Sequence, residues 1–375
     1  MKKVIYLDNA ASSHPKPDIV IRKINATLQK IGANPGRSGH SMALAASRIL
    51  FETRESLAEL LNLPSSERII FTKNCTEGIN LALKGLLKPG DKVAVSKLEH
   101  NSVARPLETL KKNGVIVEYA PCDEYGLPDP KKVPKVKMLV TVAASNVTGA
   151  VLDIAALSSA CKSKGVVFML DAAQMAGSIP LDGSLCDILA APGHKGLLGP
   201  QGTGFVWFKK GIEPDVILEG GTGSNSEEFD SPSFWPDRHE AGTCNTPGIA
   251  GLGAATQYLL KRGIASIRER ETVLCEMILD EIRDIGKVIT YPPYDINKKA
   301  NLVLFNVDGT DPSQLAWEMD NQGVALRSGL HCCPEAHRFL ETYPEGGVRV
   351  SPGYATTKKD VKQFLKVLDG FVKHR

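Results

Sequence analysis

The sequence predicts an α/β protein built on a mainly parallel sheet of seven strands, with helices on both faces and a smaller α+β domain beside it. Short apolar runs alternate with segments of helical apolar spacing from Arg68 to Phe208, a pattern typical of parallel sheets. After Pro247 this alternation stops, and a long helical stretch is followed by few strands. The chain has 375 residues, 42% hydrophobic and 23% charged, which is enough for one large core and a satellite domain.

The elements of the larger domain follow from apolar spacing. Residues 41–62 carry apolar side chains at helical intervals and predict the first helix. Apolar runs then predict the strands, at residues 69–71, 93–95, 115–119, 138–142, 166–170, 188–190 and 204–208. Segments with helical spacing predict the helices between them, at residues 76–87, 103–112 and 154–164.

The second domain begins where the pattern changes. A helical stretch of about 247–285 precedes a strand at 302–307, a helix at 312–321, a strand at 324–326 and an amphipathic helix from 357. We therefore expect a large domain at 14–262 and a small domain at 263–375 that also includes residues 1–13.

Composition and charge exclude several classes of function. The net charge of +3 is too small to favour binding to nucleic acid or to a membrane surface. No apolar run approaches the roughly 18 residues that span a bilayer, and the start of the chain does not resemble a signal peptide, since Asp8 interrupts its short apolar run. Eight cysteines without such a signal indicate free thiols in a reducing compartment, so we expect a cytoplasmic protein.

The most informative residue is Lys195, together with Asp171. The apolar strand at 166–170 ends in Asp171, and Lys195 follows in a glycine-flanked turn after the next strand. A lysine can form a Schiff base with pyridoxal 5'-phosphate, and an acid can hold the proton on the pyridine nitrogen of that cofactor. This pairing predicts an enzyme that acts on amino acids.

Three further segments follow strands and carry polar side chains toward the expected ligand edge of the sheet. Cys75 and Thr76 open a helix, whose free N–H groups suit a phosphate, although a plain helix cap has the same pattern. His100 could stack on the cofactor ring or lie in a surface loop. Asn146 could offer its amide to the ring oxygen of the cofactor or stabilise a turn.

A thiol and an arginine near the C-terminus complete the candidate site. Cys332 follows a histidine in a turn, where a neighbouring imidazole or cation can favour the thiolate, although many cysteines are inert core residues. His331, Cys333 and His337 superficially resemble metal ligands, but adjacent cysteines chelate poorly and the chain has no C-x-x-C pair, so we predict no metal. Arg349 could bind a substrate carboxylate or form a surface ion pair.

Together these motifs resemble a known family. The chain is similar to the cysteine desulfurases and selenocysteine lyases of the class V aminotransferase fold, within the fold-type-I pyridoxal phosphate enzymes. The resemblance covers nearly the whole chain, and the compact motif around Cys332 resembles the short-loop group. It is carried by Tyr6–Ala11, Thr76–Gly78, Glu99–His100, Ser145–Val147, Asp171–Gln174, Gly193–Lys195, Glu240–Pro247 and Arg327–Cys332.

The resemblance implies roles for the cofactor-binding residues. Lys195 would attach the cofactor and move the α-proton, Asp171 would pair with the pyridine nitrogen, and Gln174 would pair with the ring oxygen. The remaining implied contacts are stacking by His100 and phosphate binding by Thr76 and His194, with Cys75 beside them. Thr243 would reach the phosphate bound by a neighbouring subunit, which implies a homodimer with shared active sites.

The resemblance also implies the substrate and the reaction. Arg349 and Asn146 would bind L-cysteine, and Cys332 would accept its sulfur as a persulfide while L-alanine leaves. An unidentified acceptor protein would then take the sulfur from Cys332, as sulfur mobilisation for iron–sulfur cluster assembly requires. Selenocysteine lysis, another class V aminotransferase or lyase reaction, and a non-catalytic role in sulfur assembly stay open as alternatives.

The sequence departs from the family pattern at three places. Pro192 replaces a serine that bonds the phosphate, residues 354–357 replace a segment that usually ends in Asn-Thr, and Cys333 replaces a small alanine. Cys333 could form a vicinal disulfide or a second persulfide site. Because Cys333 precedes Pro334, we expect an extended segment in which only one thiol faces the cofactor, and we choose Cys332.

Overall fold

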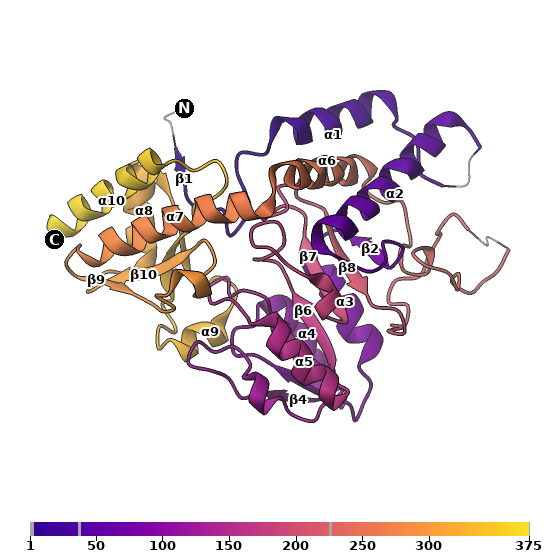
Figure 1. Ribbon diagram of the computed structural model, residues 1–375, viewed down its shortest axis with the longest axis horizontal. Coiled ribbons are helices and arrows are strands. Elements are labelled where there is room, and N and C mark those ends of the chain that lie inside the picture. The colour runs from indigo at the N-terminus through magenta and orange to yellow at the C-terminus, as the bar shows by residue number, and fades with distance from the viewer. Residues whose placement is uncertain (1–3, 37–38, 225–226, 375) are drawn as a thin grey trace.

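The computed structural model describes residues 4–36, 39–224 and 227–374. Figure 1 shows a larger lobe around the main sheet and a smaller lobe that contains both ends of the described chain. The long helix α7 (Ile264–Arg283) runs from the larger lobe into the smaller one. The predictions at residues 1–3 and 375 lie outside the described residues.

The main sheet has seven strands and confirms the predicted α/β architecture. Its order is β2-β8-β7-β6-β5-β3-β4. The strands are β2 (Ile69–Thr72), β3 (Lys92–Val95), β4 (Ile116–Tyr119), β5 (Met138–Val142), β6 (Val167–Asp171), β7 (Ile188–Pro192) and β8 (Gly204–Phe208). β4, β3, β5, β6 and β7 pair in parallel, whereas β8 is antiparallel to both of its neighbours.

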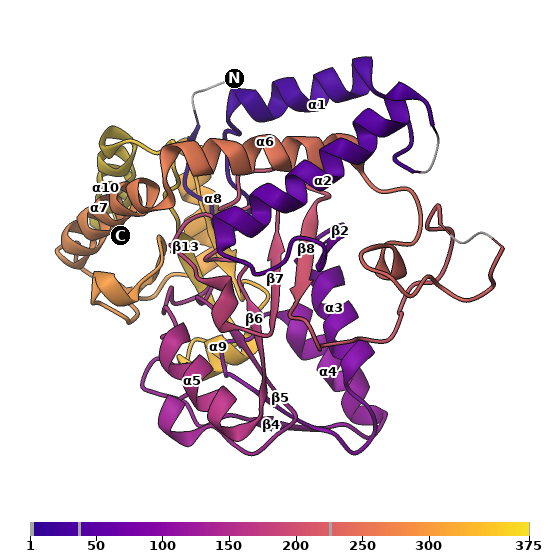
Figure 2. The ribbon, with the colours of Figure 1, turned by 45° about the vertical axis from the view of Figure 1, so that its right-hand side comes forward.

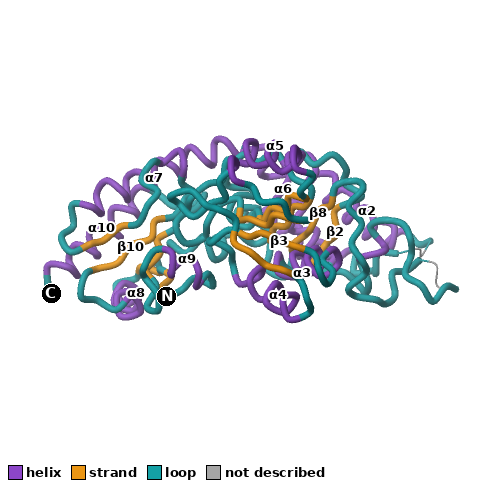
Figure 3. Tube along the Cα trace, turned by 90° about the horizontal axis from the view of Figure 1, so that it is seen from below, coloured by secondary structure: helices purple, strands orange, loops and turns teal. Residues whose placement is uncertain are grey.

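Helices cover both faces of this sheet, which explains why its central strands are apolar along their whole length. Figure 3 shows α3 (Cys75–Leu86) and α4 (Asn101–Lys112) on one side, with α5 (Ile154–Lys164) and α6 (Thr246–Arg262) on the other. Every residue of β5, β7 and β8 is buried. Because β4, β3, β5, β6 and β7 are parallel, their carboxyl ends lie at one common edge of the sheet.

Two helices pack along α6 at the end of the larger lobe (Figure 2). The helix α2 (Ser41–Leu61) was predicted, but α1 (Asp18–Lys30) was missed. Only Val20 and Thr27 of α1 are buried, while Ile19, Ile21 and Leu28 are exposed. Val20, Ile24 and Thr27 nevertheless recur at helical spacing along the face that packs on the core, so the helical period was present in the sequence and was overlooked.

The smaller lobe has a four-stranded sheet of order β12-β13-β10-β9 with helices beside it. Its strands are β9 (Val288–Thr290), β10 (Val303–Val307), β12 (Arg327–Gly329) and β13 (Gly347–Val350), and its helices include α8 (Pro312–Asn321), α9 (Pro334–Phe339) and α10 (Lys358–Lys373). A separate pair joins β1 (Ile5–Tyr6) to β11 (Val324–Ala325).

The helical stretch predicted at about 247–285 consists of two helices, α6 and α7. Gly263 adopts a φ of 81°, in the left-handed region that favours glycine, and separates α6 from α7. A hydrophobic cluster of the smaller lobe combines Leu7 with buried residues from Leu274 to Val372. The proposed division at residue 263, with the N-terminal segment in the small domain, stays a prediction.

Candidate active site

The polar side chains singled out in the sequence meet at the carboxyl edge of the main sheet. Asp171 is the last residue of β6, and His100, Asn146 and Lys195 follow the neighbouring strands β3, β5 and β7. Ligands of α/β proteins bind at this edge because several strand ends present their loops there. The resulting pocket is lined by all of the predicted site residues of the described chain except Thr243.

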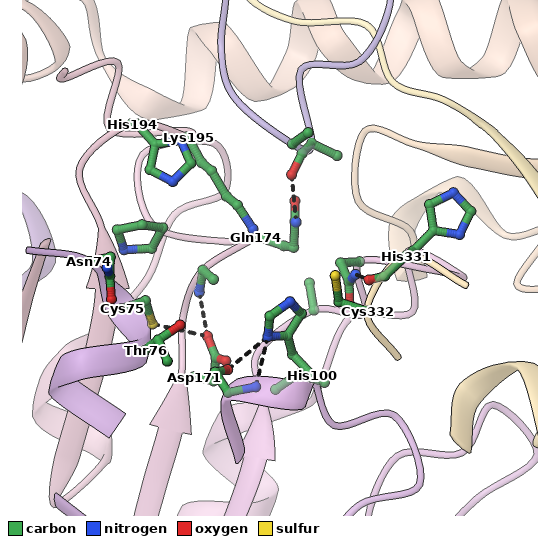
Figure 4. A pocket seen from close by; sticks show the side chains of 18 of the residues that line it. Asn74, Cys75, Thr76, His100, Asp171, Gln174, His194, Lys195, His331 and Cys332 are labelled. Carbon is green, nitrogen blue, oxygen red and sulfur yellow. Dashed lines mark hydrogen bonds between the residues drawn. The ribbon is translucent and has the colours of Figure 1, made fainter. Parts of the chain in front are cut away.

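Lys195 enters the pocket from a tightly packed turn (Figure 4). A Cβ atom on Gly196 would lie 2.3 Å from the hydroxyl oxygen of Ser178, so glycine lets this turn approach its neighbours. The N-terminal segment holds the same turn, since the Ser13 amide and the Lys16 ammonium donate to the His194 carbonyl at 3.0 and 2.7 Å. Burial lowers the pKa of Lys195, and the Asp171 carboxylate opposes that shift.

Asp171 is 3% exposed and lies below Lys195 in the pocket (Figure 4). Its Oδ1 accepts from the Ala173 amide at 2.9 Å, and the Cys75 thiol lies 3.6 Å from the same oxygen. Burial raises the pKa of the Cys75 thiol well above its ordinary value, and the Asp171 charge adds to this effect. Cys75 is therefore a thiol donor to Asp171 rather than a nucleophile.

The start of α3 and His194 form the polar end of the pocket. Asn74 caps α3, since its Oδ1 accepts from the Glu77 amide at 2.9 Å, and this leaves the exposed Thr76 free of any capping role. The alternative that Thr76 is the plain helix cap is therefore wrong. His194 Nδ1 is buried without a partner, and burial lowers the pKa of the ring to about 4.

Hydrogen bonds at the start of α4 orient the His100 ring in the pocket. It caps α4, and its Nδ1 accepts from the Ser102 amide at 3.0 Å. This bond leaves Nε2 as the protonated nitrogen of the neutral ring. Burial lowers the pKa of His100, although the Asp171 charge raises it. The ring lines the pocket, so the surface-loop alternative is wrong.

The amide groups of Gln174 and Asn146 already have partners. Gln174 Nε2 donates to the Ala10 carbonyl at 2.9 Å. Asn146 Nδ2 donates to the His331 carbonyl at 2.8 Å, and Asn146 Oδ1 accepts from the Cys333 thiol at 2.9 Å. In this arrangement Asn146 stabilises the loop of Cys332, and a ligand would have to compete for its amide.

Arg349, on β13, is 1% exposed and is one of the residues that line the pocket. Its Nη2 lies 2.9 Å from Asp8 Oδ1, and its Nη1 donates to the Asn146 carbonyl at 2.8 Å. The alternative of a surface ion pair is wrong, because the guanidinium is buried. Asp8 was not recognised as a site residue. Its position at the end of a short apolar run was the only sign in the sequence that Asp8 belongs to the site. Its contact with Arg349 depends on the fold.

The two adjacent cysteines have opposite environments. Cys332 is exposed and lines the pocket, with its Sγ 3.6 Å from Arg327 Nη2. Cys333 is fully buried, and burial raises the pKa of its thiol far above the ordinary value. Both are free thiols.

The prediction that this segment is extended is wrong at the residues before Cys333. His331 and Cys332 have φ values of 50° and 59°, in the left-handed region. Cys333 has a φ of −134°, a value in the extended range that the following proline favours. Only Cys332 lines the pocket, but the cause is the left-handed turn and not strand-like alternation.

Thr243 lies apart from the pocket. It lines a second hollow, together with residues of β2, α3 and the loop before α6. The prediction that Thr243 completes the site of a neighbouring subunit stays a prediction. Among the described residues, no group of three His, Cys, Asp or Glu side chains is placed to hold a metal ion, and no helix is long and apolar enough to cross a membrane.

Comparison with known proteins shows the family to which the chain is similar. Residues 5–364 match the family model described as Aminotransferase class-V. A probable cysteine desulfurase of Methanothermobacter thermautotrophicus is 35% identical, with 97% of this chain and 94% of that protein covered. A probable cysteine desulfurase of Pyrococcus abyssi is 33% identical, with 99% of this chain and 95% of that protein covered.

Solved structures agree with the sequence relatives. The apo cysteine desulfurase of Thermococcus onnurineus superposes with a TM-score of 0.94 at 31% identity, and the match covers 99% of this chain and 95% of that one. The cysteine desulfurase CsdA of Escherichia coli has a TM-score of 0.88 at 29% identity, with the same coverage.

Proposed function

The chain belongs to the cysteine desulfurases of the class V aminotransferase family, and we propose that it transfers the sulfur of L-cysteine to Cys332 and releases L-alanine. It is an enzyme of this kind. The observation that carries the proposal is a single pocket that presents a buried lysine–aspartate pair on one side and the exposed Cys332 thiol on the other (Figure 4). The pair suits an amino-acid substrate, and the thiol suits transfer of its sulfur.

The residues of the pocket fit pyridoxal 5'-phosphate. His194 Nδ1 is a buried ring nitrogen without a partner. It lines the pocket together with Thr76 and the amino end of α3, and these groups could donate to a phosphate. Lys195 would attach the cofactor, Asp171 would face its pyridine nitrogen and His100 would lie against its ring. When bound, this cofactor supplies an electron sink for bonds broken next to the substrate amine.

Lys195 is suited to move the α-proton. Burial lowers its pKa, so a larger fraction of its amine is neutral and can accept a proton from the substrate. Asp171 stays close enough to favour the protonated form afterwards. The His194 carbonyl, held by Ser13 and Lys16, keeps the turn of Lys195 in one position.

Arg349 binds the substrate carboxylate in this proposal. Its Nε is buried without a partner, and Asp8 and the Asn146 carbonyl orient the rest of the guanidinium. Burial lowers the pKa of Arg349, and the Asp8 carboxylate opposes that shift and so favours the charged guanidinium. Asp8 therefore also competes with the substrate carboxylate, and binding would shift part of the guanidinium from one acid to the other.

Cys332 is the sulfur acceptor. Its thiolate attacks the sulfur of the substrate, so that an S–S bond forms while the Cβ–S bond of the substrate breaks. The electron pair of the broken bond stays with the β-carbon, which takes up a proton and leaves as alanine. Arg327 Nη2 lies 3.6 Å from Sγ and can donate to it, and His100 Nε2 is a protonated nitrogen in the same pocket.

The proposal includes a homodimer in which Thr243 completes the phosphate site of the partner. Apolar side chains are exposed on α2 and on the loop that follows β8, where a second copy could cover them. They include Met42, Leu44, Phe51, Ile217, Leu218 and Phe234. An acceptor protein would then take the sulfur from Cys332. The free thiols of the described chain support a reducing, cytoplasmic location.

One assay tests the proposed function. Purified protein with pyridoxal 5'-phosphate and L-cysteine should form one alanine for each sulfur transferred to the enzyme as persulfide, with the first sulfur found on Cys332 by mass spectrometry. L-selenocysteine is the matched comparison substrate. Turnover of selenocysteine alone, or transamination without sulfur release, would refute the proposal and favour one of the alternative class V reactions.

A further inference from the structure

Three buried polar side chains form a connected row behind the Cys332 loop. His331 is 3% exposed, His337 on α9 is 0% exposed and Thr342 is 9% exposed. His331 Nδ1 lies 3.2 Å from His337 Nε2, and His337 Nδ1 lies 2.8 Å from Thr342 Oγ1. The two ring planes are nearly parallel, with centroids 5.4 Å apart and an interplanar angle of 21°. Figure 4 shows the His331 ring directed away from the centre of the pocket.

The Arg327 carbonyl selects one direction of proton donation along this row, in which the Thr342 hydroxyl donates to His337 Nδ1 at 2.8 Å and not to the His337 carbonyl at 3.3 Å. His331 Nε2 lies 3.4 Å from the Arg327 carbonyl, which can only accept, so Nε2 carries the proton. His331 Nδ1 then accepts from His337 Nε2, and His337 Nδ1 accepts from the Thr342 hydroxyl. Both rings are neutral, because burial lowers the pKa of His331 well below its ordinary value and that of His337 to about 4.

The row supports a strained piece of backbone. His331 and Cys332 both have positive φ values, and such conformations persist in non-glycine residues only where several contacts enforce them. Two contacts act on the backbone itself: Asn146 Nδ2 donates to the His331 carbonyl and the Asn101 amide donates to the Cys332 carbonyl, each at 2.8 Å. The His331 side chain is the third anchor, and it depends on His337 and Thr342.

We propose that His337 and Thr342 are positioning residues for sulfur transfer, which act through His331 to hold the Cys332 thiol in the pocket. Neither residue lines the pocket, so any effect on the reaction must pass through the loop. A row of neutral donors and acceptors fixes direction as well as distance, since the tautomer of His331 set by the Arg327 carbonyl decides which nitrogen of His337 donates. The inference rests on the proposed function, in which Cys332 accepts the sulfur.

The test compares two substitutions of Thr342 in the full-length holoenzyme. Thr342→Val keeps the shape but removes the hydroxyl, whereas Thr342→Ser keeps the hydroxyl and removes a methyl group. After mixing with L-cysteine, mass spectrometry of quenched samples gives the rate at which persulfide forms on Cys332. Thr342→Val should slow this step about tenfold, the expected effect of losing one buried hydrogen bond. Thr342→Ser should stay within about twofold of the wild-type rate.

Further readouts separate positioning from general damage. Both variants should keep the absorbance of the bound cofactor and the KM for cysteine, because the loss falls on the transfer step. In the wild-type holoenzyme, ¹⁵N NMR of ring-labelled histidine at about pH 7 should show both imidazoles neutral with the proton on Nε2. A proton on Nδ1 of either ring would overturn the inference, whether or not the valine variant folds.

The outcomes distinguish the inference from the function on which it rests. If wild-type protein forms no persulfide, the proposed function fails. If the wild type forms persulfide and Thr342→Val matches its rate, the function stands and the positioning role is refuted. An equal loss in Thr342→Val and Thr342→Ser would also refute it, because the hydroxyl would then be irrelevant.

Discussion

The two adjacent cysteines offer the sharpest prediction, because their environments are opposite although they are neighbours in sequence. We expect Cys332→Ala to abolish persulfide formation and Cys333→Ala to keep most of it. Cys332 is exposed in the pocket, beside Arg327. Cys333 is 0% exposed, and its thiol donates to Asn146 Oδ1 at 2.9 Å. A thiol that is a buried donor has neither access to substrate nor a useful thiolate population.

The magnitude follows from the state of each thiol. Every unit by which burial raises the pKa of Cys333 lowers its thiolate fraction tenfold, and the shift is large and upward. Cys332→Ala should therefore reduce persulfide formation by at least about a thousandfold, since Cys333 cannot replace it. Cys333→Ala removes one buried sulfur and one hydrogen bond, so it should lower the free energy of unfolding by about 1–3 kcal/mol.

The assay is mass spectrometry of the protein after a short exposure to L-cysteine, followed by peptide mapping of the added sulfur. The absorbance of the bound cofactor serves as the control for folding in both variants. Persulfide on Cys333 alone, or full turnover by Cys332→Ala, would refute the reasoning. A vicinal disulfide in freshly purified protein would contradict the free thiols of both residues.

Three other predictions concern the lysine, a buried acid and the assembly. Lys195→Ala should abolish covalent cofactor attachment and turnover together, and a borohydride-reducible adduct that survives in this variant would place the attachment elsewhere. Burial raises the pKa of Glu99 from 4.5 to about 8, so in wild type this group makes folding less favourable as pH rises from about 4.5 to about 8. Glu99→Gln should thus raise the free energy of unfolding relative to wild type between pH 5 and 8, by up to several kcal/mol. A difference in melting temperature between the two proteins that does not change with pH would exclude the titration of Glu99 as its cause. The proposed homodimer should lose cofactor on dilution as subunits separate, and sedimentation of a monomer with full cofactor occupancy would contradict the shared site of Thr243.

Several features could be predicted from the sequence because local chemistry decides them. Apolar runs of the right length specify the strands of the main sheet, since a strand buried on both faces needs apolar side chains throughout. Lys195 and Asp171 could be paired from their positions after two successive strands, because parallel strands end at one edge. Gly263 was passed over within a helical pattern, since a single glycine is compatible with a helix until its backbone takes a positive φ.

Other features depend on contacts between distant segments, and only the tertiary structure decided them. The Arg349–Asp8 ion pair joins residues 341 positions apart, and the Cys333–Asn146 bond joins residues 187 positions apart. The sequence alone determined that Cys332 and Cys333 were candidate thiols, together with the lysine that defines the chemistry. Their division into an exposed and a buried thiol follows from the left-handed turn at His331 and Cys332, which long-range hydrogen bonds enforce against its local conformational cost.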